Sequence, residues 1–272
     1  MSNTQTWLGR LGVGLVVLAG LAGAGWWLIG PDWRALIANP PSGRDVLFWS
    51  VPQRDAAFRM IDQLPMIIES RPIKAGGNAH PLPDGTPLDL APAIDLDAFM
   101  QTQNAASLVI LQDGKVRLER YGIGFTAKGK WTSFSVAKSL TSTLVGAAIK
   151  DGHIKSLDDK VTDYIPDLAG SPYDDVTVAQ LLTMTSGVAW NEDYEDPASD
   201  VALFDKQEVE PGKSGIVAYM RTLERAHPPG EQWNYSTGET NLIGVLVSEA
   251  VGKPVAEYLT EKIWTPYGME SD

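Results

Sequence analysis

The 272-residue sequence contains no cysteine and only three histidines, at positions 80, 153 and 227. The absence of cysteine excludes a disulfide framework, a thiolate zinc site and a cysteine nucleophile. Because the histidines are scattered along the chain, they do not form a sequence pattern that would hold a metal. We therefore expect neither a metal nor another cofactor.

Positive charge is also scarce, since 22 Lys and Arg stand against 34 Asp and Glu, a net charge of −12. A protein that binds nucleic acid needs a basic surface to neutralise phosphates, so a nucleic-acid partner is not expected. Hydrophobic residues make up 44 % of the chain and charged residues 21 %. This composition is typical of a globular protein with a large core.

One long apolar run lies near the N-terminus, from Leu11 to Gly30, and contains no charged residue. A helix of this length crosses a bilayer core of about 30 Å, and Trp26, Trp27 and Trp33 suit its interface. We predict an N-terminal transmembrane helix that holds the remaining chain at the membrane, on the periplasmic or extracellular side. The alternative is a signal peptide cleaved near Ala22-Gly23-Ala24, which would also lead to export.

Three parts follow from these patterns: residues 1–30 as anchor or signal, 31–104 as a linker rich in proline and glycine, and 105–272 as the main domain. The main domain begins with two β-type runs, Ser107–Gln112 and Lys115–Gly122, on either side of Asp113-Gly114. Asp-Gly favours the type I′ turn of an antiparallel hairpin.

Helical patterns dominate the later part of the chain. They lie at residues 177–187, 215–226, 239–251 and 255–264, and one strand is expected at residues 231–236. A hairpin followed by helices predicts an α+β fold.

The stretch Trp131–Leu140 carries the strongest chemical signal. Ser135 stands three residues before Lys138, and apolar residues recur every fourth position from Val136 onward, as in an amphipathic helix. The hydroxyl and the amine then lie one turn apart on the polar face. They are either solvated surface residues with Ser135 as a helix cap, or a nucleophile and its proton acceptor.

Four segments occur in a fixed order around this pair. They are Ser135-Val136-Ala137-Lys138, Leu181–Gly187, Pro229-Gly230 leading to Tyr235-Ser236-Thr237, and Pro266–Met269. Together they resemble the serine hydrolases related to class C β-lactamases, over roughly residues 105–272. The segment Trp190–Ser199 looks most like the branch of 6-aminohexanoate-dimer hydrolases and their esterase relatives. The resemblance implies a β-lactamase/transpeptidase-like fold, with an antiparallel sheet flanked by helices and a mostly helical subdomain.

The resemblance also implies a reaction, hydrolysis of a small-molecule amide or ester through an acyl-enzyme on Ser135. Lys138 would hold or accept the hydroxyl proton, and Tyr235 would act as general base and then protonate the leaving group. Lys138 cannot be fully a base and a cation at the same time, so the division between the two residues stays open.

Substrate-binding roles are expected for Trp190, Tyr194, Asp205 and Thr237. The first two would form an aromatic wall, and Asp205 would bind a substrate amine. The alternatives are a packed tryptophan, an exposed tyrosine and an acid without a specific role. Thr237 stands where the family usually has asparagine, which puts the substrate contacts at this position in doubt.

Two further functions stay open, D-Ala-D-Ala peptidase or β-lactamase activity and a non-catalytic, penicillin-binding-like role in the cell envelope. The third motif of the family, a Lys/His-Thr-Gly-like triplet, does not occur between Tyr235 and Asp272. We therefore expect a C-terminally truncated member of the family. The sequence gives no indication of the oligomeric state.

Overall fold

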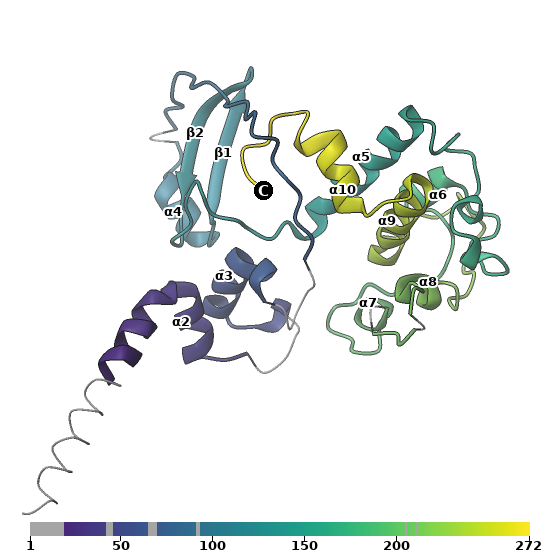
Figure 1. Cartoon of the computed structure of the whole chain (residues 1–272), viewed down its shortest axis with the longest axis horizontal. Helices are drawn as coiled ribbons and strands as arrows, with labels where there is room; N and C mark the ends of the chain where they lie inside the picture. The colour runs from purple at the N-terminus through teal and green to yellow at the C-terminus, as the bar shows by residue number, and fades with distance from the viewer. Residues whose placement is uncertain (1–18, 42–45, 65–69, 91–92, 205, 210) are drawn as a thin grey trace, which may run out of the picture. The chain divides into compact units, whose positions relative to one another are not determined.

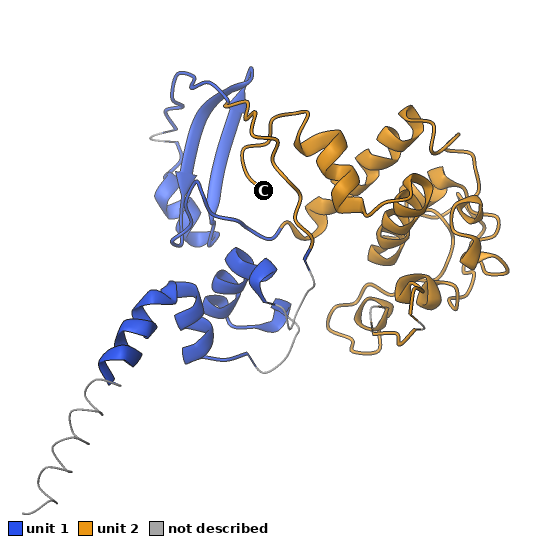
Figure 2. Cartoon of the chain, in the orientation of Figure 1, with its two compact units in different colours: residues 1–70, 82–132 blue, residues 71–81, 133–272 orange. Residues whose placement is uncertain are grey.

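The computed structural model describes residues 19–41, 46–64, 70–90, 93–204, 206–209 and 211–272 (Figure 1). The chain divides into two compact units (Figure 2). Unit 1 comprises residues 1–70 and 82–132, and unit 2 comprises residues 71–81 and 133–272. The domain boundaries expected at residues 30 and 104 stay a prediction.

The first part of unit 1 is helical. Residues 19–28 are helical, and the elements that follow are α2 (Gly30–Ala38), η1 (Val46–Phe48), α3 (Val51–Met60), η2 (Ile61–Gln63) and α4 (Leu96–Thr102). Helix α3 begins at a capping box between Ser50 and Gln53. It buries Ala57 and Met60 in a small core that also contains Leu36 of α2. These contacts join α2 to α3.

The predicted membrane helix, Leu11–Gly30, falls only partly within this description, because residues 1–18 lie outside the described residues. Of the helices in the described ranges, none is long and apolar enough to cross a bilayer. The membrane anchor therefore stays a prediction from the sequence.

The predicted hairpin is confirmed. Strands β1 (Ser107–Gln112) and β2 (Lys115–Tyr121) pair antiparallel, with Ser107 opposite Tyr121 and Gln112 opposite Lys115. The turn residues Asp113 and Gly114 have φ values of 52° and 71°, as the type I′ turn requires. Within the described residues, these two strands form a small antiparallel sheet, which confirms the α+β class.

Unit 2 is mostly helical. Its elements are η3 (Phe134–Val136), α5 (Ala137–Lys150), η4 (Val161–Asp163), η5 (Pro166–Leu168), α6 (Val178–Leu182), α7 (Asp200–Leu203), α8 (Gly215–Met220), α9 (Thr237–Val251), α10 (Val255–Leu259) and the π-helical turn η6 (Thr260–Trp264). Helix α5 packs on α9. Fully buried Leu144 of α5 and Leu246 of α9 belong to the same core. This core holds the two helices that carry the candidate site.

Three secondary-structure predictions in unit 2 need correction. Residues 231–236 do not form a strand. Instead, α9 begins at Thr237, earlier than predicted, because the Ser236 hydroxyl caps the helix by accepting a hydrogen bond from the Glu239 N–H. The helix expected over residues 215–226 is α8 and ends at Met220. The helix expected over residues 177–187 is α6, which is capped by Thr177 as predicted but ends at Leu182.

Candidate active site

Ser135 lies in η3, the 3₁₀ turn that leads directly into α5. The preceding residue, Phe134, has a φ of 42°. This left-handed conformation costs a residue with a Cβ about 1–3 kcal/mol and persists only where its surroundings hold it. The turn exposes Ser135 and places its backbone N–H in the first turn of the helix, where such groups can stabilise a negative charge.

The structure brings together the three residues expected to be catalytic. The Nζ of Lys138 donates a hydrogen bond to the Oγ of Ser135 at 3.0 Å. The Tyr235 hydroxyl donates to the same oxygen, also at 3.0 Å. The Lys138 Nζ lies 5.2 Å from the centre of the Tyr235 ring. Ser135 Oγ therefore has two neighbours that could receive its proton, Lys138 and Tyr235. The amine of Lys138 also lies close to the face of the Tyr235 ring.

The segment before Tyr235 is held against the loop that follows α6. The backbone N–H of Asn234 donates to Met184 O at 3.0 Å, and the Asn234 amide donates to Trp190 O at 3.1 Å. Gly187 in the same loop has a φ of +74°, and a Cβ there would lie 2.0 Å from the His227 carbonyl oxygen. Only glycine permits this close approach. Leu181–Gly187 and Pro229–Thr237, two of the segments that resemble the family, thus position Tyr235 together.

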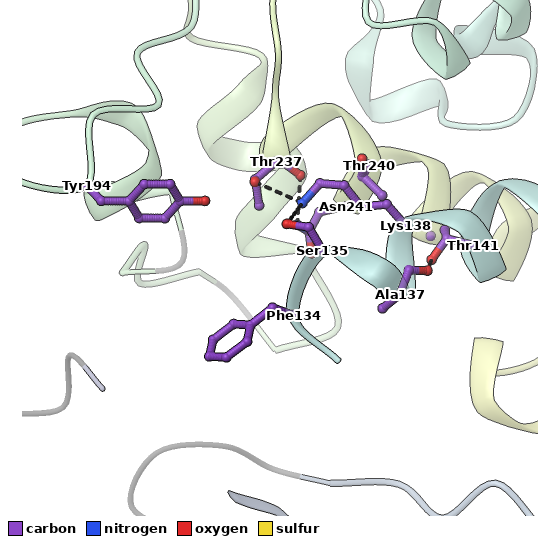
Figure 3. A pocket seen from close by; sticks show the side chains of 10 residues that line it. Phe134, Ser135, Ala137, Lys138, Thr141, Tyr194, Thr237, Thr240 and Asn241 are labelled. Atoms are coloured by element: carbon purple, nitrogen blue, oxygen red, sulfur yellow. Dashed lines mark hydrogen bonds between the residues drawn. The ribbon is translucent and has the colours of Figure 1, made fainter. Parts of the chain in front are cut away.

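A pocket of about 360 Å³ opens beside Ser135 and Lys138 (Figure 3). Its lining residues are Phe134, Ser135, Ala137, Lys138, Thr141, Tyr194, Thr237, Thr240, Asn241 and Gly244. The volume suits a small molecule. Within the described ranges of the chain, no cluster of three or more His, Asp or Glu side chains could hold a metal ion.

The predicted substrate-binding residues fall in different places. Tyr194 lines the pocket, and burial, followed by its hydrogen bond to Glu192, raises the pKa of its hydroxyl. Thr237 also lines the pocket, and its Oγ1 accepts a hydrogen bond from Lys138 Nζ at 3.1 Å. Trp190 is buried rather than in the pocket wall, and its ring packs edge-on against Phe204 at 5.7 Å. The proposed role of Trp190 as a pocket wall is therefore replaced by a packing role.

The prediction for Asp205 concerns a residue that lies outside the described residues.

Glu192 is the residue of this region that sequence reasoning missed. Its carboxylate accepts hydrogen bonds from the indole N–H of Trp190, the hydroxyl of Tyr194, and both the backbone N–H and the hydroxyl of Thr237. The one signal in the sequence that could have found Glu192 is its position two residues from both Trp190 and Tyr194. The contact with Thr237 spans 45 positions and leaves no pattern in the sequence.

A second carboxylate, Glu239, lies in the first turn of α9 and is 3 % exposed. Its Oε1 accepts a hydrogen bond from the Ser186 hydroxyl. Among the described residues, neither its Oε2 nor the buried Tyr173 hydroxyl has a hydrogen-bond partner. Burial raises the pKa of Glu239 to about 7, and the Ser186 hydrogen bond only partly opposes this shift.

Comparison with known proteins gives the family of the chain. The β-lactamase family model matches residues 96–272, more than half of the chain. The 6-aminohexanoate-dimer hydrolase of Paenarthrobacter ureafaciens is 31 % identical over 183 residues, which cover 65 % of this chain and 46 % of that protein. A β-lactamase of Pseudomonas fluorescens is 26 % identical over 193 residues, 67 % of this chain and 50 % of the relative.

A solved structure from Bacillus anthracis, assigned as a 6-aminohexanoate-dimer hydrolase, matches with a TM-score of 0.67 at 20 % identity. The match covers 82 % of this chain and 61 % of the other, and it supports the fold. The chain belongs to the β-lactamase family. It spans about half the length of the curated relatives that it matches.

Proposed function

We propose that this protein is a serine hydrolase that cleaves an amide or ester bond of a small molecule through an acyl-enzyme on Ser135. The observation that carries the proposal is the pair of 3.0 Å contacts to Ser135 Oγ, one from Lys138 and one from Tyr235. A serine hydroxyl needs such a basic neighbour to become a nucleophile near neutral pH.

The reaction follows from these positions. Ser135 Oγ attacks the substrate carbonyl carbon while its proton passes to Lys138 or Tyr235. The Ser135 N–H, at the start of the helix, donates to the oxyanion that forms. Tyr235 then protonates the departing amine or alcohol, and the carbonyl–leaving-group bond breaks. Water then attacks the carbonyl carbon of the Ser135 ester and gives a proton to the same pair. The pair passes this proton to Ser135 Oγ as the ester bond breaks, and the carboxylic acid is released.

For the substrate class, we propose a linear amide or ester of the kind cleaved by 6-aminohexanoate-dimer hydrolases. The support is the similarity to the relative of that name and the open pocket beside Ser135. D-Ala-D-Ala peptidase or β-lactamase activity is the alternative within the same chemistry. A panel of a 6-aminohexanoate dimer, an acyl-D-Ala-D-Ala peptide, a cephalosporin and p-nitrophenyl esters separates these possibilities.

A non-catalytic binding role is the second candidate, and one observation favours it. The Thr237 hydroxyl is already hydrogen-bonded to Lys138 and Glu192, so it has no spare donor for a substrate. Binding of a cell-wall peptide that survives Ser135→Ala and Lys138→Ala, without turnover by the parent protein, would support this role.

The location remains a proposal from the sequence. We propose that residues 11–30 direct the protein to the membrane or across it, with the hydrolase domain outside the cytoplasm. Fractionation of cells that express the full chain tests this proposal.

The test of the function is covalent labelling by a fluorophosphonate, followed by intact mass measurement of the full chain. We expect one adduct per chain, lost in Ser135→Ala together with hydrolysis of the substrate panel. Ser139→Ala, which removes an exposed hydroxyl one turn further along α5, is the matched control and should label like the parent. No adduct in the parent, or unchanged hydrolysis in Ser135→Ala, overturns the proposal.

A further inference from the structure

The carboxylate of Glu192 has each oxygen occupied by two donors. Oε2 accepts from the Trp190 indole N–H and from the Thr237 backbone N–H, the latter at 2.9 Å. Oε1 accepts from the Tyr194 hydroxyl, at 2.7 Å, and from the Thr237 hydroxyl. An ionised carboxylate accepts all four of these hydrogen bonds, whereas a protonated carboxyl group would need one of the two hydroxyls to stop donating and accept its proton. The ionised form of Glu192 is therefore the form that fits this site.

This arrangement fixes the direction of the Thr237 hydroxyl. A threonine hydroxyl has a single proton, and an ionised carboxylate can only accept, so that proton points to Glu192. The oxygen of Thr237 then offers only lone pairs to Lys138, whose Nζ lies 3.1 Å away. Lys138 must donate one N–H to Thr237.

This hydrogen bond affects how Lys138 can take the proton of Ser135. In the structure Lys138 donates to Ser135 Oγ at 3.0 Å. To take the Ser135 proton it must act as a neutral amine, which has two N–H donors and one lone pair. With one N–H committed to Thr237, that lone pair can turn to the Ser135 hydroxyl. Figure 3 shows Lys138 reaching both Ser135 and Thr237.

We propose that Glu192 is a positioning residue that orients the Thr237 hydroxyl and thereby keeps the Lys138 lone pair available to Ser135. Among the described residues Glu192 has no hydrogen bond to Ser135 or Lys138, and its link to Lys138 runs through the Thr237 hydroxyl. The inference rests on the proposed acyl-enzyme function of the same site.

The substitution Glu192→Gln makes a sharp test because it would reverse the direction in which the Thr237 hydroxyl donates its proton. The indole N–H of Trp190 and the backbone N–H of Thr237 cannot rotate, so the amide oxygen must stay on them. The amide NH₂ then faces the two hydroxyls and donates to Thr237. The Thr237 proton turns toward Lys138 and occupies the lone pair that Ser135 needs.

The experiment measures the rate of fluorophosphonate labelling of Ser135 in the full chain, resolved into a maximal rate and a half-saturating concentration. We expect Glu192→Gln to lower the maximal rate by about 10- to 100-fold with little change in the half-saturating concentration. Glu195→Gln removes an exposed carboxylate of the same loop and should label at the parental rate.

Thr237→Val tests the same link without disturbing the indole, Tyr194 and backbone contacts of Glu192. It should lower the maximal rate less than Glu192→Gln does, because Lys138 loses the acceptor that holds one N–H but no hydroxyl proton occupies its lone pair. Thr237→Ser should regain most of this loss because the hydroxyl returns. The double variant Glu192→Gln/Thr237→Val should label like Thr237→Val rather than like Glu192→Gln, since the amide affects Lys138 only through the Thr237 hydroxyl. If Glu192→Gln does not fold, a parental rate in Thr237→Val still overturns the inference, because the proposed link from Glu192 to Lys138 runs through the Thr237 hydroxyl.

Parental labelling rates in Glu192→Gln or Thr237→Val, or rate losses that multiply in the double variant, overturn the inference and leave the proposed function intact. A parent protein that does not label at Ser135 overturns the proposed function and the inference together.

Discussion

Two carboxylates contact the start of helix α9, and they differ in how their charge is compensated. Glu192 is partly exposed and accepts four hydrogen bonds, two of them from Thr237. Glu239 is 3 % exposed, accepts one side-chain hydrogen bond, from Ser186, and keeps one oxygen without a partner among the described residues. The first network leads to Lys138 and the nucleophile, whereas the second lies within the core.

This difference predicts that one carboxylate mainly affects the rate of the reaction and the other mainly affects the free energy of unfolding. A carboxylate that is matched by donors carries its charge with little penalty, so substitutions around Glu192 should change the reaction more than the fold. A buried carboxylate with one unmatched oxygen opposes folding in its charged form. Substitutions at Glu239 should therefore change stability and its dependence on pH.

The largest effect is expected on the side of the reaction, from Lys138→Met. This substitution keeps most of the length of the unbranched side chain and removes the amine that contacts Ser135 and Thr237. The labelling rate should fall by about 100- to 10,000-fold, the range for loss of a general acid–base group. Thermal unfolding monitored by circular dichroism should change little. Lys150→Met, at the exposed end of α5, is the control, and a parental rate in Lys138→Met would exclude Lys138 from proton transfer.

On the buried side, Glu239→Gln should change the pH dependence of stability. The pKa of Glu239 is about 7 in the folded protein, against an ordinary 4.5. Between these values the folded state binds more protons than the unfolded state, so the free energy of unfolding falls as pH rises. The loss is on the order of 3 kcal/mol between pH 4.5 and 7.

Glutamine does not titrate, so Glu239→Gln should remove most of this decline and be more stable than the parent at pH 8. Urea unfolding at pH 5 and pH 8 measures both values. Glu249→Gln, an exposed acid on the same helix, should keep the parental dependence. An unchanged decline in Glu239→Gln would show that another group is responsible.

A smaller effect is expected from Gly238→Ala, between Thr237 and Glu239. A Cβ there would lie 2.5 Å from the Met220 sulfur and 2.7 Å from the Trp190 ring. The added methyl should destabilise the protein by about 1–3 kcal/mol. It should also slow labelling, because Trp190 donates to Glu192.

The control for this substitution is Gly146→Ala in α5, where a Cβ would have no neighbour within 4 Å. It should stabilise the helix by up to about 1 kcal/mol. Equal unfolding free energies for the two alanine variants would show that the space beside Gly238 is not restrictive.

Local sequence patterns predicted the local structure well. Asp113-Gly114 between two β-type runs strongly favours a tight hairpin turn, and the structure confirms this turn. The contact between Ser135 and Lys138 follows from helical periodicity. Periodicity alone would nevertheless have placed Val136 in the core, whereas it is 70 % exposed.

Contacts between distant segments were beyond local patterns. The approach of Tyr235 to Ser135 came from a resemblance, because no period links positions 100 residues apart. The network of Glu192 was missed for the same reason, since two of its donors belong to Thr237. The strand expected at residues 231–236 was wrong because Asn234 of this segment hydrogen-bonds to the loop after α6, through its backbone N–H to Met184 O and its amide to Trp190 O, rather than to a second strand.

The most direct measurement is the location of the acyl group during turnover. An activated ester is mixed with the full chain, quenched in acid within the first turnovers and digested for peptide mass mapping. A single acyl group on Ser135, absent when Ser135→Ala is treated identically, is the predicted result. Acylation of Ser133 or Ser139 instead of Ser135 would contradict the assignment of Ser135 as the nucleophile. Hydrolysis of the ester by Ser135→Ala at the parental rate, without any acylated peptide, would contradict it equally.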